Sequence, residues 1–251
     1  MEMGTFLISW QTGTHLIPRR RYPSTMRARI VILSGSGLSA ESGLPTFRDA
    51  AGLWRQHSWQ DLASPEGWRK DPALVLEFYN ERRAKAWAAQ PNAAHLAIAT
   101  LETKFDVAVV TQNVDSLHER AGSTKVLHVH GELAFARGTG ASRRRYRIDG
   151  APIQLGQHCD EGTQLRPDIV WFGEETQHMD TARELVAAAN KVLVVGTSLS
   201  VYPAASLVDT AREDADKVLN SLEMDEVPRG FRFLPGPATR VVPRIIKEWL
   251  R

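Results

Sequence analysis

Cysteine is almost absent from this sequence, since Cys159 is the single one among 251 residues. The chain therefore cannot form an internal disulfide or a zinc site that needs two of its own thiolates. A lone thiol fits a reducing compartment, so we expect a cytoplasmic protein. The sequence also lacks an apolar run of the ~18 residues that would span a bilayer.

Charge of one sign is not in excess either. The 31 basic and 29 acidic side chains leave a formal net charge of +2. This charge is too small to indicate a nucleic-acid or membrane partner. The hydrophobic share of 43% is ordinary for a globular chain.

The first 25 residues differ from the rest of the chain. They contain one acidic residue, Glu2, and three consecutive arginines, Arg19 to Arg21. They lack the apolar core of a secretory signal. An organelle-targeting leader is one interpretation, although serine is sparse. We favour a disordered tail, with Met26 opening a folded domain of residues 26–251.

From Met26 onward, apolar runs of strand length alternate with helical patterns. The runs are rich in Val and Ile and continuously apolar, which is typical of strands buried on both faces of a parallel sheet. The alternation predicts an α/β fold with a Rossmann-like open parallel sheet and helices on both sides. The expected strands are residues 29–35, 105–112, 125–131, 168–173, 191–198 and 216–220. The expected helices include residues 92–102, 181–189, 203–213 and a closing helix over 241–251.

Two segments interrupt this pattern. Residues 49–90 are helical and aromatic, and residues 132–166 have poor periodicity and several glycines. We expect both to form a small inserted lobe. The large lobe would then comprise residues 26–48, 91–131 and 167–251.

A glycine-rich stretch, GSGLSAESGLPTFR, directly follows the first strand. Gly35 and Gly37 permit close backbone approach, and a helix N-terminus there would present free N–H groups to a phosphate. A dehydrogenase would next need a strand that ends in an acidic residue. The sequence has GLWRQHSWQD in that place, so it predicts a nucleotide site without the hydride-transfer arrangement.

Three further clusters follow strands, where open α/β sheets bind their ligands. TQNVDSLH places Gln112, Asn113 and Asp115 together, and GTSLSVYPAA offers a glycine and hydroxyls. HVHG places His128 and His130 two apart, on one face if both lie in a strand. These two histidines could hold a metal, one could be catalytic, or both could be packing residues.

These motifs, in this order, resemble those of sirtuins, a family of NAD-dependent protein-lysine deacylases. The resemblance also includes LRPDIVWFGE and the LN pair at 219–220, and it covers about residues 29–245. It implies an NAD-binding large domain, a small lobe, and a cleft where an acylated lysine of a protein meets NAD.

The resemblance also assigns roles by position. His130 would be the general base, which suits a histidine with a pKa near neutrality; Asn113 and Asp115 would complete the catalytic set, and His128 would be a packed neighbour. The implied NAD-binding residues are Gly35, Ser36, Gly37, Ser39, Phe47, Arg48, Trp54, Gln112, Asn113, Asp115, Gly196, Thr197, Ser198, Asn220 and Ala238. The implied substrate-peptide residues are Val170, Phe172, Gly173, Glu174, Val201 and Tyr202.

The zinc ligands of the family are missing. Most sirtuins hold a structural zinc with four cysteines, and the first pair would fall near Gly138 to Ala141, neither of which is cysteine. The second pair falls near His158 and Cys159, and two potential ligands cannot close a tetrahedral site. We therefore predict a small lobe without zinc.

Tyr79 and Arg82 lie three apart on a predicted helix and so share a face. In class III sirtuins such a pair binds the carboxylate of succinyl- or malonyl-lysine, and the small Ala50 would leave room for it. We expect a desuccinylase or demalonylase with some deacetylase activity. An NAD glycohydrolase or ADP-ribosyltransferase, and a non-catalytic NAD-binding sensor, remain alternatives.

Overall fold

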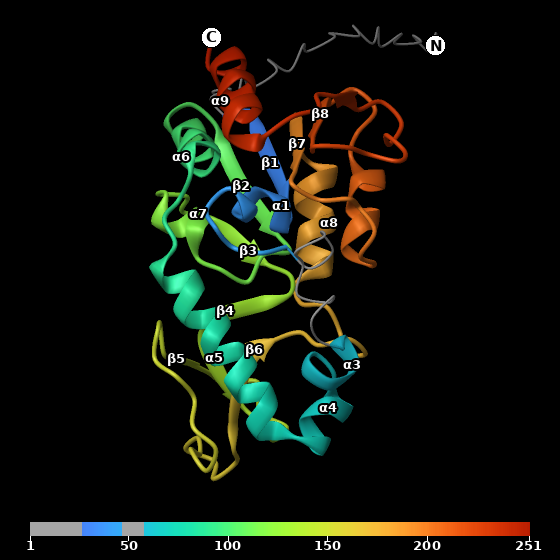
Figure 1. Ribbon diagram of the computed structural model, residues 1–251. Coiled ribbons are helices and arrows are strands. Elements are labelled where there is room, and N and C mark those ends of the chain that lie inside the picture. The colour runs from blue at the N-terminus through green and yellow to red at the C-terminus, as the bar shows by residue number, and fades with distance from the viewer. Residues whose placement is uncertain (1–26, 47–57) are drawn as a thin grey trace, which may run out of the picture.

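A six-stranded parallel sheet forms the larger lobe of the computed structural model, which describes residues 27–46 and 58–251 (Figure 1). Its strand order is β3-β2-β1-β7-β8-β9. The strands are β1 (Arg29–Ser34), β2 (Asp106–Thr111), β3 (Val126–His128), β7 (Lys191–Val195), β8 (Asp216–Asn220) and β9 (Arg232–Phe233). The predicted parallel α/β sheet is confirmed, and β9 is a short strand that the sequence did not reveal.

The continuous apolar strands are explained by two cores, one on each face of this sheet. Ile30 and Ile32 pack with α6 (Ala93–Thr100) and α9 (Ala238–Trp249). Val31 and Leu33 point to the other face and pack with α8 (Met179–Ala187) and the 3-10 helix η2 (Ala204–Thr210). Since successive strand residues alternate between faces, both sets must be apolar.

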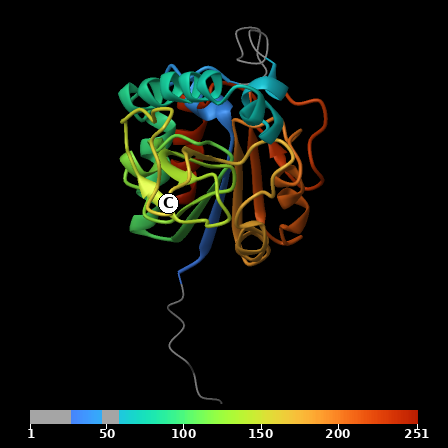
Figure 2. The ribbon, with the colours of Figure 1, turned by 90° about the horizontal axis from the view of Figure 1, so that it is seen from below.

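The smaller lobe contains a three-stranded antiparallel sheet of order β5-β4-β6. Its strands are β4 (Gly131–Gly138), β5 (Arg145–Arg147) and β6 (Leu165–Ile169). Three helices complete the lobe: α3 (Trp59–Leu62), α4 (Pro65–Lys70) and α5 (Pro72–Ala88). Figure 1 shows this lobe below the parallel sheet, and Figure 2 shows α5 along one side of the molecule.

Local signals explain where the lobe's helices begin. The side chains of Ser58, Ser64 and Asp71 each accept a backbone N–H in the first turn of α3, α4 and α5. Pro65 and Pro72 open the latter two helices, where their missing N–H costs nothing. These N-terminal caps divide the segment into three helices, whereas the sequence predicted only that residues 49–90 are helical.

The strand predicted over 168–173 is wrong in place and length. β6 covers Leu165–Ile169 and pairs antiparallel with β4 in the small sheet. The chain then turns, and the Glu174 carboxylate accepts the Trp171 N–H at 2.9 Å. A buried apolar run has the same composition in a parallel and in an antiparallel sheet. The composition of this segment therefore could not show to which sheet it belongs.

Three shorter elements lie around the strand ends. They are α1 (Ser36–Ala40) after β1, the 3-10 helix η1 (Leu101–Thr103) before β2, and α7 (Leu117–Arg120) after β2. β3 ends at His128, so His130 lies in the turn before β4 and the predicted shared strand face is wrong. Within the described ranges, no helix is long and apolar enough to cross a membrane.

Candidate active site

Two loops meet in backbone contact at the carboxyl ends of β1 and β7. Gly35 donates to the Val195 carbonyl at 3.0 Å, and Gly37 donates to the Gly196 carbonyl at 2.8 Å. A Cβ on Gly37 would lie 2.9 Å from that same Gly196 oxygen, and Gly196 itself has a φ of +64°. Glycine is needed at these positions because a side chain would not fit between the two loops.

The amide and the carboxylate after β2 are buried together against the glycine turn. The Asn113 side chain donates to the Gly35 carbonyl and to the Ser39 hydroxyl, both at 3.1 Å. Ser39 in turn donates to Asp115 at 3.0 Å. Burial raises the pKa of Asp115, against the hydrogen bonds from Leu117 and Ser39. Three predicted site residues therefore form one connected network.

The far end of the site is built around Asn220. Its side chain donates to the carbonyls of Leu234 and Gly236, and its backbone carbonyl accepts the Gly196 N–H at 3.0 Å. The Asn220 Oδ1 atom is buried and has no hydrogen-bond partner among the described residues. A buried acceptor without a donor is costly unless a ligand supplies one. This end of the site can therefore receive a hydroxyl or amino group.

The neighbouring hydroxyls complete that end. The Gln112 amide lies 3.3 Å from the Thr197 hydroxyl, which joins the loops after β2 and β7. Ser198 contacts Ser200 at 2.6 Å, and Ala238 is buried where α9 begins. The predicted residues Gly196, Thr197, Asn220 and Gln112 are thus brought together.

The two histidines bind consecutive backbone carbonyls of the loop after β2. His130 Nδ1 lies 3.3 Å from the Gln112 oxygen, and His128 Nδ1 lies 2.8 Å from the Asn113 oxygen. Each Nδ1 is the donor, because a carbonyl can only accept. In neutral His130 the lone pair is therefore on Nε2, the nitrogen that can serve as a base.

The environments of these histidines shift their pKa values in opposite directions. Burial lowers the pKa of His130, and the Gln112 carbonyl only partly opposes it. Burial would also lower the pKa of His128, but its hydrogen bond to Glu119 and the charges of Glu119 and Glu132 raise it overall. The surroundings of His130 therefore favour its neutral form, and those of His128 favour its charged form.

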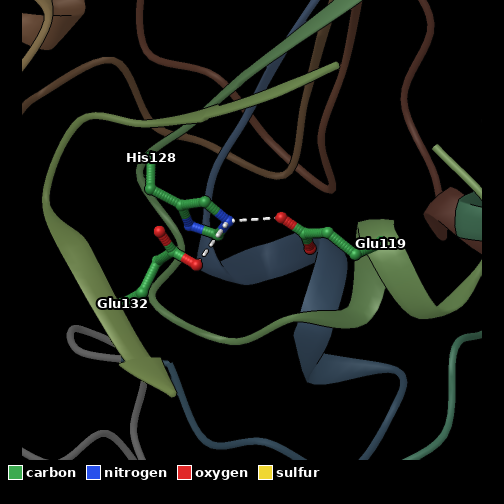
Figure 3. Close-up of side chains that lie close together, drawn as sticks. All are labelled: Glu119, His128 and Glu132. Carbon is green, nitrogen blue, oxygen red and sulfur yellow. Dashed lines mark hydrogen bonds and ion pairs between the residues drawn. The ribbon is translucent and has the colours of Figure 1, made fainter. Parts of the chain in front are cut away.

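Figure 3 shows His128 between two carboxylates that the sequence analysis did not single out. Its Nε2 lies 2.8 Å from Glu119 and 3.9 Å from Glu132. Among the residues that the structure describes, this is the one group of three with metal-ligand types close together. The direct ion pair to Glu119 and the pairing of Glu132 with Arg145 at 2.5 Å describe a salt-bridge network. The two histidines do not share a site.

A cavity of about 90 Å³ joins the glycine turn, the loop after β2 and α5. Its walls include the apolar side chains of Leu44, Phe78, Val114 and Leu133, and also Ser36, Ser39, Asn113, Asp115 and Arg82. Burial lowers the pKa of Arg82, whereas Tyr79 and Asp115 oppose this shift. Tyr79 itself is only 4% exposed and packs beside the cavity in the core that contains Trp171.

The predicted peptide-binding residues lie at the surface between the lobes' strands. Phe172 and Tyr202 are 44% and 74% exposed. Val170 donates its N–H to the His130 carbonyl at 2.9 Å, and Gly173 and Val201 lie in the adjoining turns. The Glu174 carboxylate binds Arg166 at 2.7 Å and Arg137 at 3.1 Å, so it fixes this turn from within.

The two residues at the predicted place of the second zinc pair lie in different surroundings. Cys159 is buried and contacts the Thr163 hydroxyl at 3.2 Å, while His158 is exposed. A Cβ on Gly138 would lie 2.9 Å from the Cys159 sulfur. The four predicted site residues Phe47, Arg48, Ala50 and Trp54 lie outside the described residues, as does the predicted N-terminal tail.

A parallel sheet whose strand ends carry a glycine turn, buried amides and a histidine is typical of nucleotide-binding α/β proteins. Comparison with known proteins names the class. Residues 35–203 match the model of the Sir2 family. A Helicobacter pylori protein named NAD-dependent protein deacylase is 51% identical over 186 residues, which cover 74% of this chain and 79% of that protein. A Shewanella oneidensis protein of the same name is 43% identical over 230 residues, covering 88% of this chain and 94% of its own.

Solved structures agree with this assignment. A Sir2 homologue in complex with ADP-ribose has a TM-score of 0.81 at 38% identity, over 89% of this chain and 94% of that one. A Sir2 homologue in complex with NAD has a TM-score of 0.78 at 38% identity, over 90% and 91%. The chain belongs to the Sir2 family, and its cofactor is NAD. The glycine turn and the unpartnered Asn220 oxygen fit such a dinucleotide.

Proposed function

We propose that this enzyme removes succinyl or malonyl groups from lysine side chains of proteins and retains some deacetylase activity. The coarser activity, NAD-dependent protein deacylation, is that of its named relatives and follows from membership of the family. The products would be nicotinamide, O-acyl-ADP-ribose and free lysine. The finer preference rests on the position of Arg82 in the cavity beside Asn113 and Asp115.

Arg82 supports an acidic acyl group because it places a cation on the wall of this cavity, which also carries the Lys85 ammonium and the carboxylates of Glu81 and Asp115. Leu44, Phe78, Val114 and Leu133 line the same space. Burying a cation there is costly, which is why burial lowers the pKa of Arg82. A guanidinium binds a carboxylate through two parallel hydrogen bonds. A charge-assisted bond contributes about 1.5–3 kcal/mol, which corresponds to a ~10–100-fold preference for succinyl over acetyl.

The other residues have roles that follow from their contacts. NAD, when bound, would supply an electrophilic ribose carbon with nicotinamide as its leaving group. Asn113 and Asp115, fixed by Ser39 and Gly35, orient the groups in the cavity. His130 Nε2 takes the proton from a ribose hydroxyl, since its Nδ1 is bound to the Gln112 carbonyl.

The peptide side is proposed from exposure and backbone geometry. An acylated peptide would lie along Phe172, Gly173, Val201 and Tyr202, with Val170 and Glu174 holding the turn from beneath. One structural neighbour, described as Sir2 bound to acetylated peptide, has a TM-score of 0.73 at 28% identity and covers 89% of this chain. Recognition through backbone contacts would tolerate many peptide sequences.

Turnover of matched acetyl-, malonyl- and succinyl-lysine peptides by the wild type and Arg82→Met tests the proposal. We expect succinyl and malonyl turnover to exceed acetyl turnover, and Arg82→Met to lower the succinyl-to-acetyl ratio by ~10–100-fold. Arg69→Met removes an exposed cation on α4 and serves as the control, whose ratio should not change. A wild type that prefers acetyl-lysine would contradict the acidic-acyl pocket. ADP-ribose without free lysine would instead indicate an NAD glycohydrolase.

A further inference from the structure

Asn113 is held at every polar atom of its backbone as well as by its side chain. Its N–H donates to the Thr111 hydroxyl at 3.0 Å, and that hydroxyl accepts from Ser34 at 2.8 Å. Its carbonyl accepts from His128 at 2.8 Å. The loop after β2 is therefore fixed from β1 and β2 on one side, and from the His128 ring on the other.

We propose that His128 is a positioning residue for the deacylation reaction, because the ring fixes the Asn113 carbonyl while Glu119 and Glu132 fix the ring. This inference rests on the proposed function, since the loop it holds carries Asn113 and Asp115. His128 touches neither of these side chains directly. It acts through the backbone of the loop that presents them to the cavity.

The ring needs both of its N–H groups to make these contacts. Its Nδ1–H donates to the Asn113 carbonyl, and its Nε2–H donates to Glu119 (Figure 3). Neither partner can donate in return, because one is a carbonyl and the other a carboxylate. A neutral ring has one N–H for two acceptors, so only the charged ring satisfies both. Deprotonation of His128 therefore leaves one N–H for which the Glu119 carboxylate competes with the Asn113 carbonyl, so the ring no longer holds both.

The charged groups around the ring favour that state. Glu119 belongs to α7 and Glu132 to β4, while Arg145 on β5 binds Glu132 from the far side at 2.5 Å. The charge of His128 also acts to lower the pKa values of Asp115 and His118. The Glu119 side chain is 37% exposed, so solvent weakens its attraction, but the His128 side chain is 4% exposed. Two carboxylates thus face the imidazolium directly and outweigh its burial.

Two substitutions separate the two nitrogens of the ring. In His128→Asn the side-chain amide nitrogen takes the place of Nδ1 and can still donate to the Asn113 carbonyl. In His128→Gln the longer side chain carries its amide nitrogen toward Glu119 and leaves that carbonyl without its donor. A lost hydrogen bond to a buried group costs about 1–3 kcal/mol. Because ~1.4 kcal/mol corresponds to a tenfold change in rate, we expect kcat of His128→Gln to fall by ~5–100-fold. The kcat of His128→Asn should change less.

The pH dependence of turnover distinguishes this positioning role from simple packing, because a residue that only fills space would not affect it. We expect wild-type turnover to decline on the alkaline side as His128 loses its proton. Glu119→Gln removes one facing charge and should move this decline to lower pH, whereas Glu77→Gln, an exposed control on α5, should leave it in place. Equal kcat for His128→Asn and His128→Gln at equal melting temperature, or a decline that Glu119→Gln does not move, would overturn the proposal.

A measurement without turnover distinguishes this inference from the proposed function. NMR titration of the ring nitrogens, with the His128 signal assigned from its absence in His128→Asn, reports the protonation state in the resting protein. A charged ring at neutral pH supports the proposal even if no acylated peptide is turned over. A neutral ring would contradict it. The His128 signal should also stay in place when Zn²⁺ or EDTA is added. A shift on either addition would contradict the proposal, because it would show that His128, Glu119 and Glu132 bind a metal ion.

Discussion

At the scale of single residues, this site uses one residue type in two ways. His130 and His128 are two positions apart, and both donate Nδ1–H to a carbonyl. They differ at Nε2, which in His128 is bound to the Glu119 carboxylate. The sequence predicted His130 as the base through its motif. It could not show that Glu119, nine residues before His128, returns to pair with it, because that contact depends on how α7 packs beside β3.

The lowered pKa of His130 predicts the acidic limb of the pH profile. A base is active only when deprotonated, so kcat/KM should rise with pH and reach its plateau once His130 is neutral. Because burial lowers the pKa of His130, the midpoint should lie below the ~6.5 of a free histidine. The measurement is kcat/KM from about pH 5 to 8, which reports the free enzyme. His130→Ala should lower turnover by ~10²–10⁴-fold and abolish the limb. A midpoint above that of free histidine would contradict the assignment.

At the scale of elements, the glycine after His130 determines how β4 can begin. Gly131 has a φ of +82°, and a Cβ there would overlap the carbonyl oxygen of Asp168 on β6. The same turn lets the His130 carbonyl accept the Val170 N–H at 2.9 Å. The HG pair is therefore needed for geometry as well as for chemistry, because only glycine permits β4 and β6 to approach there.

Gly131→Ala should lower both stability and turnover. A left-handed conformation costs a non-glycine residue about 1–3 kcal/mol, and the overlap with Asp168 adds to this. Melting temperature and kcat are the measurements. Gly156→Ala is the matched control, because Gly156 has a φ of +86° but no atom within 4 Å of a new Cβ. It should lower the melting temperature less and leave kcat unchanged. Equal losses in both variants would mean that the contact with β6 is unimportant.

The elements also show where sequence patterns stop being informative. The strands β1, β2, β7 and β8 were predicted in place, since burial on both faces leaves a long apolar run. The run at 168–173 has the same composition, but it belongs to the antiparallel sheet and to a turn. What decides its place is the pairing of Arg166 with Glu174, eight residues on, and the register with β4. Neither is visible as periodicity.

At the scale of the whole molecule, the small lobe must keep its shape by packing if it holds no zinc. Its inner core comprises Leu76, Ala136, Ile153, Cys159 and Leu165. Asn80 on α5 binds both the N–H and the carbonyl of Ile153 at 2.9 Å, and so ties the loop before β6 to the helix. This contact spans 73 residues, which is why the sequence did not reveal it.

Ile153 is 1% exposed in the core of the small lobe, so Ile153→Ala should destabilise the protein by about 2–5 kcal/mol. Leu155→Ala is the matched control, because Leu155 is 60% exposed two residues away and its loss should change stability by less than about 0.5 kcal/mol. Chemical denaturation of both variants gives these values. EDTA should leave the wild-type melting temperature unchanged, since the core and Asn80 hold the lobe. A fall in EDTA would show that a metal contributes, and equal effects of the two substitutions would show that Ile153 does not hold the lobe together.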